Sequence, residues 1–312
     1  MTHCGDADTL RIVKRVIVVA DVAIVTAVLA ACGSSASAPT STSTSSLSST
    51  ATSTTTTTAT SPGTTTSAKP PPSPSAPPST TINAANCRPP VQHPYPVVLL
   101  PGTYGVTAWQ LVGPQLAQLG YCVYTFAYGN GETGDIATSA QQLARFVDRL
   151  LARSGAKRIS IVGHSEGGMM PRYYIRFLGG EAKVADLVAL APSNHGTLNP
   201  STFGGAIVGC VACAEQQTGS SFLTHLNDGD ETPPPVNYTV IETAYDEVVI
   251  PYSSAFLTGP STRVTNVTLQ QQCPSDIVGH VGITSDPVAL QWVENALARR
   301  TGPADPNFVP SC

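Results

Sequence analysis

The feature that most limits how this chain can fold is a low-complexity segment that runs from Gly33 to Thr80. Of its 48 residues, 30 are Ser or Thr and eight are Pro, and Lys69 is its only charged residue. Such a segment has too little apolar surface to offset the conformational entropy that folding costs. We therefore expect residues 32–82 to form a linker. The remaining 230 residues, 83–312, are enough for one domain with a substantial core.

The N-terminus has the pattern of an export signal. Arg11, Lys14 and Arg15 precede an apolar run over residues 16–31, which is too short for a comfortable membrane span. The run ends in Leu-Ala-Ala before Cys32, which resembles the lipobox of bacterial lipoproteins, whose cysteine becomes the lipidated first residue. We expect residues 1–31 to be a lipoprotein-type signal peptide and Cys32 to carry lipid at the cell envelope. Cleavage and secretion without lipidation is the alternative.

The linker would then hold the domain at some distance from the membrane. Its composition is typical of O-glycosylated stalks, and an unmodified flexible tether is the alternative.

The charge balance of residues 83–312 excludes one class of partner. This part holds 12 Lys or Arg and 17 Asp or Glu, a formal charge of −5, and has no basic run. A mildly acidic domain of this kind argues against a nucleic-acid partner. No two-cysteine pair at zinc-finger spacing has matching histidines, so we expect no structural zinc. We expect a monomer.

Six cysteines remain in the expected domain: Cys87, Cys122, Cys210, Cys213, Cys273 and Cys312. An even number in an exported domain predicts three disulfides, which can in principle be paired in fifteen ways. Cys210 and Cys213 are near enough in sequence to close a small loop, and a redox pair is the alternative for this CxxC. The other four cysteines could then fix the start and the end of the domain.

Apolar runs alternate with amphipathic helices along the domain. We predict strands over 95–100, 121–128, 158–162, 184–190, 236–243 and 264–271. Helices are predicted over 109–119, around 143–151 and closed by Gly155, over 168–178, and from Pro287 onward with Asp286 as its N-cap. This alternation predicts an α/β fold with a mostly parallel sheet that has helices on both faces.

Ser165 lies in Gly163-His164-Ser165-Glu166-Gly167, which matches G-x-S-x-G. The string alone is a weak signal, but a predicted strand directly precedes it and a helix follows. That is the strand–elbow–helix of an α/β-hydrolase, which exposes the serine hydroxyl at the helix N-terminus. We expect Ser165 to be a nucleophile; a serine that only caps the helix is the alternative.

A serine nucleophile needs a base and an acid, which follow it in the chain order Ser, Asp or Glu, His. His280 follows the last predicted strand, and we expect it to be the base. Asp246 follows the strand over 236–243, and we expect it to orient the imidazole. Glu247 is adjacent and could substitute for it.

The oxyanion hole requires two backbone donors. Glu166 supplies the N–H after the nucleophile, and the turn after the first predicted strand, Pro101-Gly102-Thr103, supplies the second. We expect Thr103 to donate from its N–H, with its hydroxyl as a further donor.

With these residues in place, the chain resembles α/β-hydrolase lipases of the lipase B type (the Candida antarctica kind) and related exported actinobacterial lipases and esterases. The resemblance runs over most of the domain. It rests on Pro101-Gly102-Thr103, Leu119-Gly120-Tyr121, the serine elbow, Ala191-Pro192, Gln216-Gln217-Thr218-Gly219-Ser220, Asp246-Glu247, and Cys273 upstream of His280.

The resemblance implies roles for these residues. It places the nucleophile at Ser165, the acid at Asp246, the base at His280 and the oxyanion donors at Thr103 and Glu166. It also supports pairing Cys87 with Cys122, and Cys273 with Cys312. One departure is Glu166, where that family has glutamine: a carboxylate pointing inward would disfavour the oxyanion. Another is the end of the chain at Cys312, soon after the last predicted helix.

We therefore expect an exported serine ester hydrolase, a lipase or carboxylesterase that acts on acyl esters and needs no metal or organic cofactor. The segment 202–235 has no clear period, and we expect it to cover the pocket as a lid or acyl-binding wall. The alternatives are a cell-envelope acyltransferase with the same triad, a cutinase-like or polyesterase activity, and a non-enzymatic surface lipoprotein that retains the fold.

Overall fold

The computed structural model describes residues 81–105, 109–199 and 209–312. The expected signal peptide, Cys32 and nearly all of the expected linker lie outside the described residues, as do residues 202–208 of the segment expected to cover the pocket.

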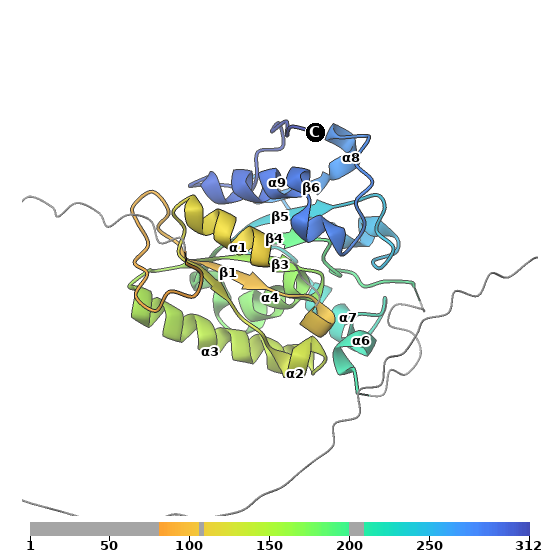
Figure 1. Cartoon of the computed structure of the whole chain (residues 1–312). Coiled ribbons are helices and arrows are strands. Elements are labelled where there is room, and N and C mark those ends of the chain that lie inside the picture. The colour runs from red at the N-terminus through yellow and green to blue at the C-terminus, as the bar shows by residue number, and fades with distance from the viewer. Residues whose placement is uncertain (1–80, 106–108, 200–208) are drawn as a thin grey trace, which may run out of the picture. The chain divides into compact units, whose positions relative to one another are not determined.

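A parallel six-stranded sheet organises the described residues (Figure 1). The strands are β1 (Val97–Leu100), β2 (Val123–Thr125), β3 (Ile159–His164), β4 (Val184–Leu190), β5 (Asn237–Glu242) and β6 (Val264–Thr268). Their order is β2-β1-β3-β4-β5-β6, and every neighbouring pair is parallel. All the strands therefore end at one edge of the sheet, and the loops that follow them meet there.

The helices are connected to the strands in alternation, as the sequence predicts. The α-helices are α1 (Trp109–Gln118), α2 (Gly129–Glu132), α3 (Ile136–Ser154), α4 (Glu166–Phe177), α6 (Val211–Glu215), α7 (Ser221–Asn227), α8 (Leu269–Gln272) and α9 (Pro287–Ala298). Short 3-10 turns are η1 (Thr103–Gly105), η2 (Gly180–Ala182), η3 (Tyr252–Ala255) and η4 (Gly282–Ser285). None of the helices in the part of the chain described here is long and apolar enough to cross a bilayer.

The sheet divides the core into two layers. Val98 and Leu100 of β1 pack with apolar residues of α3 and α4, whereas Val97 and Leu99 pack with those of α1 and α9. Successive residues of a strand point to opposite faces, so a strand covered by helices on both sides must be apolar at every position. All four residues of β1 are fully buried, which explains its unbroken Val-Val-Leu-Leu sequence.

Local signals set the ends of the helices. The Asp135 carboxylate accepts a hydrogen bond from the Thr138 N–H at 2.6 Å and begins α3, and Gly155 ends the helix with φ 73°. Asp286 caps α9 in the same way by accepting from the Ala289 N–H at 2.8 Å, with Pro287 at the first helical position. This confirms the predicted start of the last helix.

The predicted strands 95–100 and 236–243 each exceed the observed β1 and β5 by two residues, and two other predictions were longer still. The run 264–271 stops at Thr268, and Leu269–Gln272 forms the helical turn α8, with the Cys273 N–H donating to the Leu269 carbonyl at 2.9 Å. Cys273 is bonded to Cys312, so the chain turns there toward the C-terminus. The run 121–128 is a strand only over Val123–Thr125.

The described residues form three disulfides, Cys87–Cys122, Cys210–Cys213 and Cys273–Cys312, which are the expected pairs. The first and third bonds join cysteines that are 35 and 39 positions apart in sequence, and the second joins cysteines three positions apart. The long bonds restrict the unfolded chain most and attach the two ends of the domain to the sheet.

We predict that Leu143→Ala lowers the free energy of unfolding by about 2–5 kcal/mol, because it opens a cavity where α3 packs on the sheet. Leu143 is fully buried. Urea denaturation of the purified domain measures the effect. Arg149→Ala, on the exposed face of the same helix, is the control and should change stability by less than about 0.5 kcal/mol. Equal effects of the two substitutions would contradict the assigned packing.

Candidate active site

Ser165 occupies a sharp turn between β3 and α4. Its backbone has φ 53° and ψ −122°, a conformation that non-glycine residues rarely adopt and that costs about 1–3 kcal/mol. The turn is held by the Ser165 N–H, which donates to the Leu190 carbonyl at 2.9 Å. Among the described residues, the Ser165 side chain accepts no capping hydrogen bond from the N–H groups at the start of α4. Ser165 therefore stands at a helix N-terminus without capping it.

Glycines allow the segments around this turn to approach closely. A Cβ on Gly163 would collide with the carbonyl of Gly167, and a Cβ on Gly167 would collide with the carbonyl of Pro101. A Cβ on Gly102 would lie only 2.9 Å from the Ser165 Cβ. The turn after β1, the serine turn and the start of α4 are thus in direct contact, and Thr103 begins next to Ser165.

His280 and Asp246 form a buried pair at the same edge of the sheet. The His280 Nδ1 lies 2.7 Å from the Asp246 Oδ2, and both side chains are almost completely buried. The Asp246 Oδ1 accepts from the N–H groups of Val248 and Val249 at 2.8 and 2.7 Å. Burial alone would raise the pKa of Asp246, but the hydrogen bond and charge of His280 and these two N–H groups outweigh it and lower the pKa. Asp246 is therefore held as a carboxylate facing the imidazole.

Glu247 and His164 fix the backbone and the ring position of His280. The Glu247 Oε2 accepts from the His280 N–H at 3.0 Å, so Glu247 contacts the backbone and leaves the imidazole to Asp246. The His164 Nε2 lies 2.9 Å from the His280 carbonyl, and the two rings are 4.8 Å apart. Because His164 directly precedes Ser165, this contact places His280 beside the serine turn.

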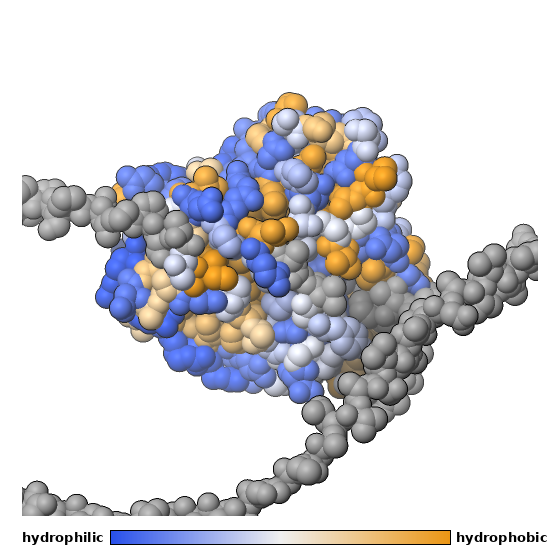
Figure 2. Space-filling model, in the orientation of Figure 1, coloured by the Kyte–Doolittle hydropathy of each residue, from blue (hydrophilic) through white to orange (hydrophobic). Residues whose placement is uncertain are grey.

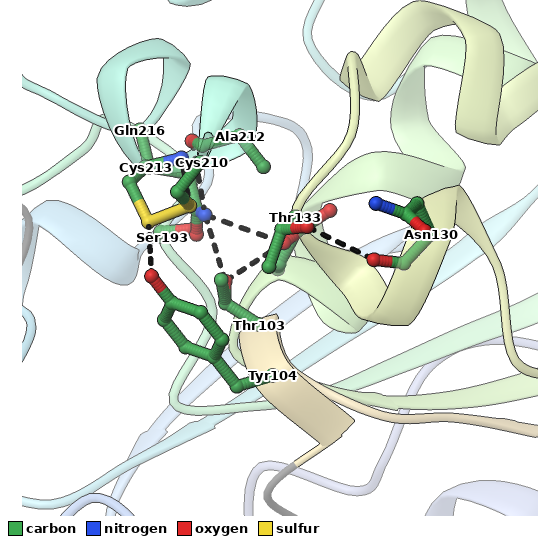
Figure 3. The surroundings of a disulfide bond; sticks show 10 residues. Thr103, Tyr104, Asn130, Thr133, Ser193, Cys210, Ala212, Cys213 and Gln216 are labelled. Carbon is green, nitrogen blue, oxygen red and sulfur yellow. Dashed lines mark hydrogen bonds between the residues drawn. A yellow bond between two sulfur atoms is a disulfide. The ribbon is translucent and has the colours of Figure 1, made fainter. Parts of the chain in front are cut away.

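The Thr103 hydroxyl lies in a buried hydrogen-bond network on the other side of the turn. Its Oγ1 is 2.7 Å from the Glu166 Oε2 and accepts from the Gln216 Nε2 at 2.9 Å. The Gln216 Oε1 in turn accepts from the Ser193 hydroxyl at 2.7 Å. Figure 3 shows Gln216, which directly follows α6, and Thr103, which follows β1, pointing toward each other. The network joins four separate segments of the chain.

The Cys210–Cys213 disulfide lies next to this network (Figure 3). The Cys210 Sγ accepts from the Cys213 N–H at 3.1 Å, and the Tyr104 hydroxyl lies 3.4 Å from the Cys213 Sγ. Backbone N–H groups of Val211 and Ala212 donate to the Thr133 carbonyl at 2.8 and 3.2 Å. The small loop therefore anchors α6, and Gln216 after it, close to the turn that carries Thr103.

Comparison with known proteins places this geometry in a family. Residues 94–293 match the family described as Lipase (class 2), a range of 200 residues out of 312. The chain belongs to the class 2 lipase family. The resemblance to lipase B predicted from the sequence is confirmed.

Two relatives show how far the similarity of this chain extends. Lipase B from Pseudozyma antarctica is 27% identical over 217 residues, which are 67% of this chain and 63% of lipase B. A triacylglycerol lipase from Pseudarthrobacter phenanthrenivorans is 31% identical over 87 residues, 25% of this chain and 27% of that protein. The chain thus aligns with less than two thirds of the length of each.

Solved structures identify the fold of this family member. Lipase B from Aspergillus fumigatus superposes with a TM-score of 0.62 at 24% identity, covering 69% of this chain and 55% of that one. A Bacillus licheniformis lipase in its propeptide form gives 0.54 at 15% identity, with coverage of 71% and 54%. The predicted α/β-hydrolase fold is confirmed.

The Glu166 carboxyl is fully buried in this chain and is positioned against Thr103. Burial raises the pKa of Glu166 to about 8; the contact with Thr103 opposes this shift, and the charges of Glu132 and Glu215 add to it. At neutral pH the side chain is therefore mostly a neutral acid. This removes most of the unfavourable charge that a carboxylate beside an oxyanion would bring.

Two further histidines of the domain lie in separate networks. His195 contacts the Ser254 carbonyl at 2.8 Å and the Glu231 carboxylate at 2.9 Å, and it joins loops. His225 is exposed and stacks on Phe177. Their roles are packing and loop attachment, and neither contacts Asp246 through a bond found in the described residues.

Sequence reasoning did not find the contributions of Gln216, His164 and Glu242. Glu242 ends β5 and is fully buried; burial raises its pKa well above the usual range, and the charge of Asp246 raises it further. Its Oε1 accepts from the Thr243 N–H at 2.8 Å. The motifs that contain Gln216 and His164 do not indicate their contacts, because Thr103 and His280 lie in segments distant in sequence.

We predict that Glu242→Gln makes stability less dependent on pH. The native state keeps the Glu242 proton above pH 5, where the unfolded chain loses it, so the native state binds more protons and the wild-type free energy of unfolding falls as pH rises. For one group this slope is up to about 1.4 kcal/mol per pH unit. Urea denaturation at pH 5, 6, 7 and 8 should show the variant gaining on the wild type as pH rises.

Glu181→Gln, at an exposed position, is the control for this experiment and should keep the wild-type slope. A Glu242→Gln protein whose stability follows the wild-type pH dependence would show that the buried carboxyl is charged in the native state.

Proposed function

We propose that this chain is an exported serine ester hydrolase, a lipase or carboxylesterase, with Ser165 as nucleophile, His280 as base and Asp246 as the acid that orients it. The buried Asp246–His280 pair beside the strained, non-capping Ser165 carries the proposal. Membership of the class 2 lipase family supports it, as do the names of the relatives, lipase B and triacylglycerol lipase.

In the proposed reaction each of these groups has one role. The Ser165 Oγ attacks the ester carbonyl while the His280 Nε2 takes its proton, and Asp246 stabilises the imidazolium through Nδ1–H. The N–H groups of Thr103 and Glu166 donate to the oxyanion. His280 then gives the proton to the leaving alcohol. Water attacks the acyl-enzyme by the reverse route and releases the acid.

Exposed apolar side chains around the strand ends support an apolar acyl substrate. They follow β1, β4 and β5 or flank α6 and His280: Tyr104, Leu198, Val211, Tyr245, Ile250, Ile277 and Val281. Figure 2 shows separate apolar areas on the side toward which the β1 arrow points in Figure 1. Apolar residues that rim a site at this edge fit an ester with a hydrocarbon chain.

Export and lipid anchoring belong to the same proposal. Three disulfides support an oxidising compartment, and the charged and apolar segments before Cys32 support export with attachment to the envelope. Anchoring would keep the hydrolase beside the membrane lipids whose esters it could use.

We predict that a fluorophosphonate labels Ser165 in the domain 83–312, because only a serine activated by a base attacks such a probe. Mass spectrometry locates the adduct. Ser165→Ala should abolish labelling, and His280→Ala should reduce both labelling and ester hydrolysis by at least about 10³-fold.

Ser221→Ala and His225→Ala change exposed residues of the same types and should retain labelling. Hydrolysis that persists in folded Ser165→Ala protein would refute the nucleophile, and absence of labelling in the folded wild type would refute an assembled triad.

We predict that Cys32→Ser moves the full-length protein from the membrane fraction to the soluble or secreted fraction, since a thioether-linked lipid cannot form without the cysteine thiol. Metabolic labelling with an alkyne fatty acid should mark the wild type and Cys4→Ser but not Cys32→Ser. Cys4→Ser, which changes the cysteine within the signal, is the control. Equal membrane retention and labelling of all three proteins would contradict lipidation at Cys32.

A further inference from the structure

The hydrogen bonds of the Thr103 hydroxyl depend on the state of Glu166. A hydroxyl has one hydrogen to donate and two lone pairs to accept with. One lone pair of the Thr103 Oγ1 accepts from the Gln216 Nε2 at 2.9 Å, and the Glu166 Oε2 lies 2.7 Å away. If Glu166 is a carboxylate, it can only accept, and the single hydrogen of Thr103 must point at it.

A protonated Glu166 reverses this hydrogen bond. The Glu166 Oε1 is buried and has no hydrogen-bond partner in the described part of the chain. A proton on Oε2 can therefore be donated in a hydrogen bond to the Thr103 hydroxyl, whereas a proton on Oε1 would have no acceptor. The Thr103 Oγ1 then accepts from both Glu166 and Gln216, both lone pairs are used, and its own hydrogen is free.

We propose that the neutral Glu166 side chain is a positioning residue that donates to the Thr103 hydroxyl and so frees that hydroxyl to donate to the oxyanion formed on Ser165. The inference rests on the ester hydrolysis proposed above. It goes beyond the two backbone donors, because it assigns a function to a side chain behind the oxyanion hole. The Glu166 proton stays in place throughout the reaction.

The surroundings of Glu166 favour the neutral form. Carboxyls face it from two elements, Glu132 of α2 and Glu215 of α6, and Tyr128 before α2 also interacts with it. The Tyr128 hydroxyl donates to the Pro101 carbonyl at 2.7 Å. A phenol carries no positive charge that would stabilise an ionised Glu166. The N-terminus of α4 favours an anion at Glu166, but complete burial outweighs this and raises the pKa to about 8.

The sign of the pH dependence follows. As pH rises through about 8, Glu166 ionises and accepts a hydrogen bond from the Thr103 hydroxyl. The oxyanion then has one hydrogen-bond donor fewer. Loss of one such donor lowers kcat by about 10²–10³-fold. Activity therefore falls on the alkaline side.

The test measures kcat/KM for p-nitrophenyl butyrate and the rate of fluorophosphonate labelling from pH 6 to pH 10. Wild type, Glu166→Gln, Thr103→Val, Thr103→Ser and Glu132→Gln are compared, each normalised to its own value at pH 6, with folding checked by circular dichroism at every pH. The wild type should lose activity above pH 8 as one group ionises. Glu166→Gln should lack this decrease, because its amide does not ionise.

The remaining variants test whether the effect passes through the hydroxyl. Thr103→Val should be slower and lack the alkaline decrease, whereas Thr103→Ser retains a hydroxyl and should retain the decrease. Glu132→Gln should shift the decrease to lower pH, because removing a nearby negative charge lowers the pKa of Glu166. If Glu166→Gln does not fold, the Val and Ser pair at Thr103 still decides the matter.

Several results would overturn the inference. They are wild-type activity that stays level to pH 10, an alkaline decrease unchanged in Glu166→Gln, or one that persists in Thr103→Val. Failure of the wild type to label at Ser165 at any pH would refute the proposed function and this inference together. Labelling at Ser165 with any of the first three results would refute the inference alone.

Discussion

Backbone packing around Ser165 is the constraint on which the rest of the site depends. Gly102, Gly163 and Gly167 bring the turn after β1 and the start of α4 into contact at the serine turn. A side chain at Gly167 would push against the carbonyls of Leu100 and Pro101, and Thr103 would move with them. The parallel sheet then supplies the remaining groups, because the loops after β5 and β6 end at the same edge. Close packing and strand direction together determine where the chemistry can occur.

Features encoded locally could be predicted from the sequence. The strand 184–190 was predicted at its observed bounds, since β4 is an unbroken buried run, and the start of α9 was predicted from its Asp-Pro cap. The fold and the family followed from the strand–elbow–helix and the motifs around it. The boundary of β6 was not predictable, since Gln-rich residues 270–272 match both a strand and a helical turn and the bond from Cys273 to Cys312 is a distant contact.

Residues that support the candidate site were harder to predict than the proposed triad. Gln216 reaches Thr103 across 113 positions of sequence, and His164 reaches the carbonyl of His280 across 116. Nothing near Glu242 indicates that it ends its strand next to Asp246. The roles proposed for Ser165, His280 and Asp246 rest on motif order and are compatible with the observed geometry, whereas the supporting contacts exist only in three dimensions.

Three buried carboxyls near this edge also differ in charge. Asp246 has an imidazole and two N–H partners, whereas Glu166 and Glu242 have too few partners to remain ionised.

The Cys87–Cys122 bond has a mechanical consequence. Asn83 pairs with the edge strand β2, through its N–H to the Val123 carbonyl and its side chain to Thr125. Cys87 is then joined covalently to Cys122 at the start of that strand. Tension applied to the chain before residue 81 would pass across the sulfur atoms directly to Cys122. The loop between the two cysteines, which contains β1 and Thr103, lies outside that path. A pull that removes Asn83 from the sheet edge would therefore not be carried along the backbone between the two cysteines, which runs through β1 to Thr103.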